Sequence, residues 1–341
     1  MAIDSHPEKT LPKSISQKFG PAIPEVKCVN LALQGGGAHG AFTWGVLDRL
    51  LEESRIEVEG VSATSAGAMN AAVMAHGLTT GGRKGAREAL EEFWHGVAQD
   101  SAPFGALQLF EVMSRFFSPY QLNPFDYNPL RQLIRQVIDF ERLRQGSAIK
   151  LFLSATNVRT GKIRVFTDKE ITADCVFASA CLPLLYQAVK IDCEHYWDGG
   201  YMGNPALFPL IYSCQSRDIL IVHVNPIERP DKPTSAQEIM NRVNEISFNS
   251  SLMREMRAVA FVTKLLDDGK LNQDDAKRVL IHSVCADDVM RGFGAASKLN
   301  ADGGFLRQLR ALGRERAQAW IDYHFDDLGS RSTVDIRAAY L

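Results

Sequence analysis

Short apolar runs alternate with amphipathic segments through the first third of the chain, and this alternation constrains the fold more than any other feature. Residues 27–33 (KCVNLAL) form an apolar run that three glycines end, which predicts a buried strand. Residues 41–53 then carry apolar side chains at helical spacing. Residues 56–62 predict a second strand, and the small, apolar residues 66–76 predict a buried helix. This order predicts an α/β sheet that helices cover on both faces.

Later segments extend the same pattern. The further predicted strands are 150–156, 162–166 and 218–225, and the longest predicted helices are 239–267 and 305–320. We therefore expect a three-layer α/β/α sandwich with a mostly parallel central sheet and additional C-terminal helices.

The domain organisation follows from length and composition. A chain of 341 residues exceeds the usual size of one core but falls short of two full domains. We expect a flexible leader over residues 1–26, one catalytic domain over 27–325 and a C-terminal tail over 326–341. An aromatic, proline-interrupted insertion at about 94–130 breaks the alternation, and it can line an acyl-chain pocket as a cap or belong to the core.

Charge and cysteine content limit the kinds of partner and the cell compartment that we expect. The 38 Lys and Arg nearly balance the 40 Asp and Glu, which leaves no basic field for nucleic acid. The six cysteines form no CxxC pair and predict reduced thiols in a cytoplasmic protein. No run approaches the roughly 20 apolar residues of a spanning helix, so we expect any membrane contact to be peripheral. We predict no metal site, and the sequence does not set the oligomeric state.

A glycine-rich turn, residues 34–40 (QGGGAHG), joins the first predicted strand to the next helix. Its N–H groups converge at the positive end of the helix dipole and attract a negative charge. Gly35, Gly37 and Gly40 satisfy the GxGxxG pattern of a dinucleotide site, with Glu59 where a ribose-binding acid is expected. The turn can equally be an oxyanion hole, or only a tight connection.

A serine follows the second predicted strand. Residues 63–67 (ATSAG) end that strand and open the next helix, which is the order of a nucleophile elbow with Ser65 on a strained turn between small neighbours. Ala63 stands where glycine is usual. A serine at a helix start can also be only an N-cap, but its position one βα unit after the glycine turn favours the elbow.

A serine hydroxyl needs a base before it can act as a nucleophile. The best partner is Asp198 in residues 197–200 (WDGG), where two glycines let the carboxylate approach another backbone segment. Taken alone, Asp-Gly-Gly is most often a turn. In the company of Ser65 and the glycine turn, Asp198 becomes the candidate base.

In this order, the glycine turn, the Ser65 elbow and the Asp-Gly-Gly turn resemble the marks of the patatin-like phospholipase family. The resemblance extends over about residues 29–320. It includes residues 178–183 (ASACLP), which look like the family's loop ahead of the catalytic aspartate, and residues 123–126 (NPFD). It implies a serine acyl hydrolase that cleaves carboxylic ester bonds of lipids, of the phospholipase A, lysophospholipase or lipid acyl hydrolase type, without a cofactor.

The resemblance also implies roles for single residues. Ser65 and Asp198 become a catalytic dyad that needs no histidine. The oxyanion hole is expected at Gly35, Gly36 and Gly37, of which Gly36 and Gly37 donate their N–H groups.

Two positions depart from the family's pattern. The family usually has Arg or Lys where this chain has His39, and Gly where it has Ala63. His39 is kept as an auxiliary residue that orients substrate or a neighbouring group, and Ala63 indicates a slightly shifted elbow.

Other interpretations stay open on the sequence alone. A full triad would use His223, since α/β-hydrolases have the chain order Ser, acid, His. His195 lies near Asp198 in the sequence, but it is expected on the surface of a predicted hairpin. The chain can also be a dinucleotide-binding oxidoreductase, which leaves Ser65 and Asp198 unexplained, or a catalytically silent relative that binds lipid or protein.

Overall fold

The structure is a computed structural model that describes residues 25–99, 117–272, 274 and 276–341. Most of the predicted leader and residues 100–116 of the predicted insertion lie outside the described residues. None of the helices within the described ranges is long and apolar enough to cross a membrane. All six cysteines are described, and each is a free thiol.

One sheet forms the centre of the molecule, with the strand order β5-β6-β3-β2-β1-β7-β8 and β4 paired to β3. Its parallel strands are β1 (Lys27–Leu33), β2 (Ile56–Ala63), β3 (Lys150–Asn157), β7 (Asp218–Val222) and β8 (Leu280–Val284). Its antiparallel strands are β4 (Ile163–Thr167), β5 (Val189–Ile191) and β6 (Glu194–Asp198). Parallel strands are buried on both faces, which explains the continuous apolar runs in the sequence.

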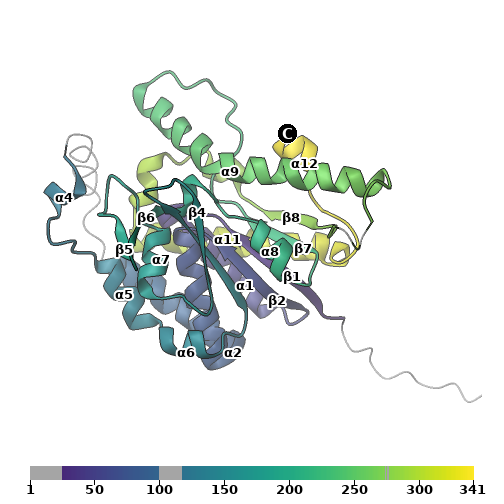
Figure 1. The fold of residues 1–341 in the computed structure, drawn as a ribbon, viewed down its shortest axis with the longest axis horizontal. Coiled ribbons are helices and arrows are strands. Elements are labelled where there is room, and N and C mark those ends of the chain that lie inside the picture. The colour runs from purple at the N-terminus through teal and green to yellow at the C-terminus, as the bar shows by residue number, and fades with distance from the viewer. Residues whose placement is uncertain (1–24, 100–116, 273, 275) are drawn as a thin grey trace, which may run out of the picture.

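Helices cover both faces of this sheet (Figure 1). The larger core cluster joins the sheet to α1 (Gly40–Glu52), α2 (Ala66–Gln99), α5 (Pro129–Val137), α6 (Phe140–Gln145), α7 (Ala173–Ser179) and α11 (Gly303–His324). The smaller cluster joins the opposite face to α8 (Phe208–Ser213), α9 (Ala236–Asp267) and α12 (Ile336–Tyr340). The predicted three-layer α/β/α class is confirmed.

Short elements complete the described part of the chain. They are α4 (Pro119–Leu122), α10 (Asp287–Met290) and the 3-10 turns η1 (Gly37–His39), η2 (Gly199–Tyr201), η3 (Ala295–Leu299) and η4 (Phe325–Asp327). The helix predicted at 66–76 continues far beyond that range in α2, with non-helical backbone at Gly81 and Gly82.

The insertion and the predicted C-terminal tail each contain a buried aromatic side chain. In the insertion, Phe125 is 92% exposed and Tyr120 and Tyr127 are also exposed, whereas Trp94 is buried in the larger core cluster. In the segment predicted as a tail, Tyr340 is buried and its hydroxyl lies 2.6 Å from His223 Nε2. The last residues of the chain are therefore packed against β7.

Candidate active site

The carboxyl ends of the central strands bring the predicted motifs to one edge of the sheet. Leu33, the last residue of β1, pairs with Ala63 at the end of β2 and with Val222 at the end of β7. Asp198, at the end of the antiparallel β6, pairs with Ala155 near the end of β3. The glycine turn, Ser65 and Asp198 therefore leave the sheet on the same side, where open α/β sheets bind their ligands.

Ser65 has a backbone conformation that side-chain-bearing residues seldom adopt. Its φ is +56°, and the residue is buried except for 8% of its surface. Its N–H donates to Ser179 Oγ at 3.0 Å, and the preceding Thr64 hydroxyl donates to the Gly203 carbonyl at 2.6 Å. A Cβ on Gly67 would lie 2.5 Å from the Leu33 carbonyl oxygen, so only glycine fits where α2 begins. This is the strained strand-to-helix geometry expected of an elbow.

Asp198 is fully buried beside that serine. Its Oδ1 accepts the Gly200 N–H at 2.7 Å. Burial raises the pKa of Asp198 to about 7, while the Gly200 N–H, hydrogen bonding from Ser65 and the positive charge of Lys298 act in the opposite direction. Oδ2 is buried and lacks an aligned hydrogen bond within the described part of the chain. Contacts between a nucleophile and its base often align only with the substrate in place.

One segment, which begins at the end of α7, positions both residues. Residues 178–183 supply Ser179, whose hydroxyl accepts the Ser65 N–H, and Cys181, whose carbonyl accepts the Asp198 N–H at 2.8 Å. The sequence pointed to this segment only through its likeness to a family loop; the structure gives it a physical role.

The three glycines of the turn differ in what their N–H groups do. Gly35 donates to Asn204 Oδ1 at 2.7 Å, so this amide is already engaged. Its contribution is the missing side chain, because a Cβ there would lie 2.5 Å from Ser65 Cβ. Gly36 and Gly37 have no hydrogen-bond acceptor for their N–H groups within the described residues. Gly37 has a φ of +58°, which turns the chain into the helix.

His39 is a buried, neutral side chain at this turn. Burial, together with the nearby positive charge of Lys298, lowers the pKa of His39 to about 3. Its Nε2 lies 2.8 Å from Ser297 Oγ on η3, and its ring packs against Phe293 and Phe305. The His39 ring therefore carries no charge at neutral pH, and its polar contact is the Ser297 hydroxyl.

Asn204 and Gln34, two polar side chains without a predicted role, hold the turn in place. Asn204 also donates its Nδ2 to the Phe248 carbonyl on α9, at 3.2 Å. Gln34 Oε1 accepts the N–H groups of Val224 and Asn225 after β7. Their partners lie far away in the sequence, so no local pattern could have marked these contacts.

The histidines weighed for a triad lie elsewhere. His223 is buried against Tyr340, and burial lowers its pKa to about 4. His195 is exposed on β6, opposite Lys190. The geometry therefore gives neither ring a contact with Ser65.

Glu59, the residue that would bind a ribose in a dinucleotide site, makes its contacts away from the glycine turn. Glu59 precedes the carboxyl end of β2 by four residues and pairs with Lys150 Nζ at 2.8 Å. Its oxygens also accept the N–H groups of Gln215 and Ser216, ahead of β7. No group of three metal-ligating side chains occurs in the described ranges.

Comparisons with known proteins bear on the family of the chain. None of the curated proteins matches it. Among solved structures, VipD from Legionella pneumophila is 15% identical over 87% of this chain and 67% of its own, with a TM-score of 0.43. The complex of full-length SpcU and ExoU from Pseudomonas aeruginosa contains a chain 14% identical over 86% of this chain and 53% of its own, with a TM-score of 0.34. The model of the family "Patatin-like phospholipase" matches residues 31–211, more than half of the chain. The chain therefore belongs to the patatin-like phospholipase family.

Proposed function

We propose that this chain is a serine acyl hydrolase that cleaves carboxylic ester bonds of lipids with Ser65 as nucleophile and Asp198 as base. One observation carries the proposal. Ser65 stands at a positive φ two residues after the end of β2, and burial raises the pKa of the carboxyl group beside it to about 7. A base whose pKa lies near the working pH transfers protons most effectively.

The reaction follows from these positions. The Asp198 carboxylate accepts the Ser65 hydroxyl proton while the serine oxygen attacks the ester carbonyl carbon. The negative charge that develops on the carbonyl oxygen is received by the Gly36 and Gly37 N–H groups, and losing one such donor typically costs about 3 kcal/mol. Protonated Asp198 then gives its proton to the departing alcohol. Water, activated in the same way, releases the acyl group from Ser65.

Apolar groups around the site support a lipid as substrate. Leu184, which directly follows residues 178–183, is 61% exposed. Tyr201 and Met202, which follow the Asp-Gly-Gly turn, are also exposed. Such side chains can contact acyl chains or a lipid surface, which fits the phospholipase A, lysophospholipase or lipid acyl hydrolase type and a peripheral membrane contact.

The proposal is tested by turnover of a medium-chain p-nitrophenyl ester. We expect Ser65→Ala and Asp198→Asn each to lower kcat/KM by roughly 10⁴-fold, because nucleophile and base act as a unit. Ser250→Ala on α9 and Asp231→Asn on an exposed loop are matched controls that should retain activity. Circular dichroism checks that all variants fold. An inactive wild type, or an active Ser65→Ala, would refute the mechanism. For an active wild type, fatty-acid release from phospholipid vesicles distinguishes phospholipase A, lysophospholipase and lipid acyl hydrolase activity.

A further inference from the structure

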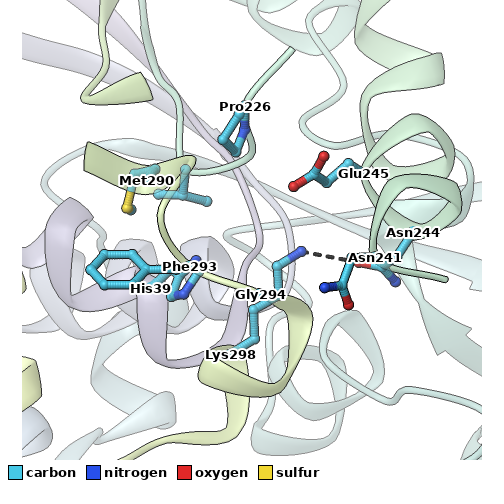
Figure 2. A pocket seen from close by; sticks show the side chains of 10 residues that line it. His39, Pro226, Asn241, Asn244, Glu245, Met290, Phe293, Gly294 and Lys298 are labelled. Atoms are coloured by element: carbon cyan, nitrogen blue, oxygen red, sulfur yellow. Dashed lines mark hydrogen bonds between the residues drawn. The ribbon is translucent and has the colours of Figure 1, made fainter. Parts of the chain in front are cut away.

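A lysine from the C-terminal part of the chain reaches the proposed site. Lys298 lies on η3, well beyond the family-matched residues 31–211. Its Nζ donates to Asn225 Oδ1 at 2.8 Å and to Asn244 Oδ1 at 3.0 Å, and it faces the Phe248 ring at 5.5 Å. Figure 2 shows Lys298 extending toward Asn244, with His39 also lining the same small cavity of about 10 Å³.

The environment of this ammonium is unusual for a lysine. The residue as a whole is partly exposed, but its ammonium is enclosed, and burial lowers the pKa of Lys298 to about 8. Within the described residues, no carboxylate lies within ion-pair distance of Nζ. A cation enclosed mainly by neutral amides costs free energy, so keeping it there lowers the stability of the fold.

The direct partner of Lys298 holds the glycine turn. Asn225, which accepts from Nζ, donates its own Nδ2 to the Gly35 carbonyl at 2.7 Å. The Lys298 backbone carbonyl also occupies the space that a Cβ on Gly37 would need. Next to it, the Ser297 hydroxyl contacts His39. Two consecutive residues of η3 therefore fix both ends of the turn whose N–H groups form the proposed oxyanion hole.

Lys298 also acts on the proposed base through its charge. The positive charge lowers the pKa of Asp198, and Asp198 in turn raises that of Lys298. Burial, and after it the charge of Asp198, raises the pKa values of Cys181 and Tyr201, so both side chains are neutral at pH 7. Lys298 is thus the cation that acts on Asp198 within the described residues.

The remaining charges near Lys298 largely compensate each other. Glu245 on α9 raises the pKa of Lys298, and Arg229 lowers it. These two side chains form an ion pair with each other at 2.5 Å, which Arg242 extends. The nearby His39 ring is neutral.

Resting on the function proposed above, we propose that Lys298 is a positioning residue of this hydrolase, which fixes the glycine turn through Asn225 and supplies a positive charge that acts on Asp198. The proposed role requires a positive charge at residue 298. If Lys298 only filled space in the core, its charge would not matter. A charged role and a packing role therefore predict different pH profiles of activity.

The test is kcat/KM for a p-nitrophenyl ester between pH 5.5 and 9.5 in wild type, Lys298→Met and Lys298→Arg. The wild type should show a bell, since activity needs ionised Asp198 and charged Lys298. In Lys298→Met the acidic limb should move to higher pH, because a positive charge that favours the ionised base has been removed. Lys298→Arg should restore the acidic limb and abolish the alkaline limb, because arginine keeps its proton.

The matched control is Lys277→Met, which removes another partly buried lysine. Lys277 Nζ donates to the Cys214 carbonyl ahead of β7, at the opposite edge of the sheet, so its profile should equal that of the wild type. A Lys298→Met profile that is lower but unshifted would overturn the proposal, as would a Lys298→Arg variant with an unchanged alkaline limb. Either result would be seen in the Lys298 variants alone and would concern only the role of Lys298. An inactive wild type would instead overturn the proposed hydrolase function and, with it, the role of Lys298.

Discussion

At the scale of single residues, the site concentrates strain and buried charge. A positive φ at a residue with a side chain costs about 1–3 kcal/mol, and Ser65 keeps this conformation because Ser179 binds its N–H and Gly67 leaves room for the helix start. Burying the Asp198 carboxyl group next to Ser65 costs further free energy of folding. Both features reduce stability and favour reactivity, as in sites where the surrounding fold stabilises an otherwise unfavourable geometry.

Asp198→Asn should therefore stabilise the fold in a pH-dependent way. Burial raises the folded-state pKa of Asp198 to about 7, well above its ordinary value, so the folded state binds this proton more tightly than the unfolded chain does. The stability that the proton confers is complete below about pH 4 and is lost as the pH rises through about 7. The variant, which is neutral throughout, should gain on the wild type across this window, by on the order of a few kcal/mol above pH 7.

Urea unfolding of both proteins between pH 4.5 and 8.5 measures this gain. Asp231→Asn, on an exposed loop, controls for the loss of a surface carboxylate. If the stability difference between Asp198→Asn and wild type does not grow with pH, the folded-state pKa of Asp198 is not raised by burial.

At the scale of elements, α1 and α11 pack backbone to backbone. A Cβ on Gly313 would collide with the Phe42 carbonyl oxygen, and one on Gly45 with that of Arg310. Asp48 of α1, 1% exposed, pairs with Arg310 at 3.0 Å and also contacts Arg314 of α11 and Arg87 of α2. Since α1 starts at the glycine turn, this packing holds one end of the site.

Gly313→Ala should consequently destabilise the protein by about 1–3 kcal/mol, the usual cost of an added methyl group in a filled core. Urea unfolding measures the loss. Gly303→Ala, in the first turn of the same helix, serves as the control, because its methyl group would meet the movable Arg307 side chain and otherwise only an ordinary contact with Ala98. Equal stability of the two variants would mean that the helices separate at little cost.

Elements with local signals could be predicted from sequence. Residues 27–33 and 56–62 match β1 and β2 because a short apolar run bounded by glycine or a turn admits little but a buried strand. Ser65 and Asp198 were identified as candidates because each lies within a short motif. Asn204, Asn225 and Lys298 could not be predicted, because their partners in the glycine turn lie 169 or more residues away, or are reached only through another side chain.

At the scale of the whole molecule, the family-matched residues 31–211 do not contain the complete sheet. The parallel strands β7 and β8 and the covering helices α9 and α11 follow this segment. Without β7, the buried edge of β1 with Leu31 and Leu33 would face water. The C-terminal part is thus structurally inseparable from the site.

A chain of residues 25–211 should accordingly fail to fold. We expect no cooperative transition in urea monitored by circular dichroism, because the segment leaves a long apolar edge and the α1 face for α11 uncovered. The chain of residues 25–341 is the control. A cooperative transition in the shorter chain would show that β7, β8 and α11 are not needed to complete the core.

The most direct test of Ser65 as an activated nucleophile is covalent labelling by a fluorophosphonate probe, read by mass spectrometry of the intact protein and of its peptides. An activated serine attacks the phosphorus of such a probe and keeps the adduct. We predict one adduct per chain, on Ser65, which is absent in Ser65→Ala and strongly slowed in Asp198→Asn. An unlabelled wild type, or an adduct on another residue, would contradict the proposed mechanism.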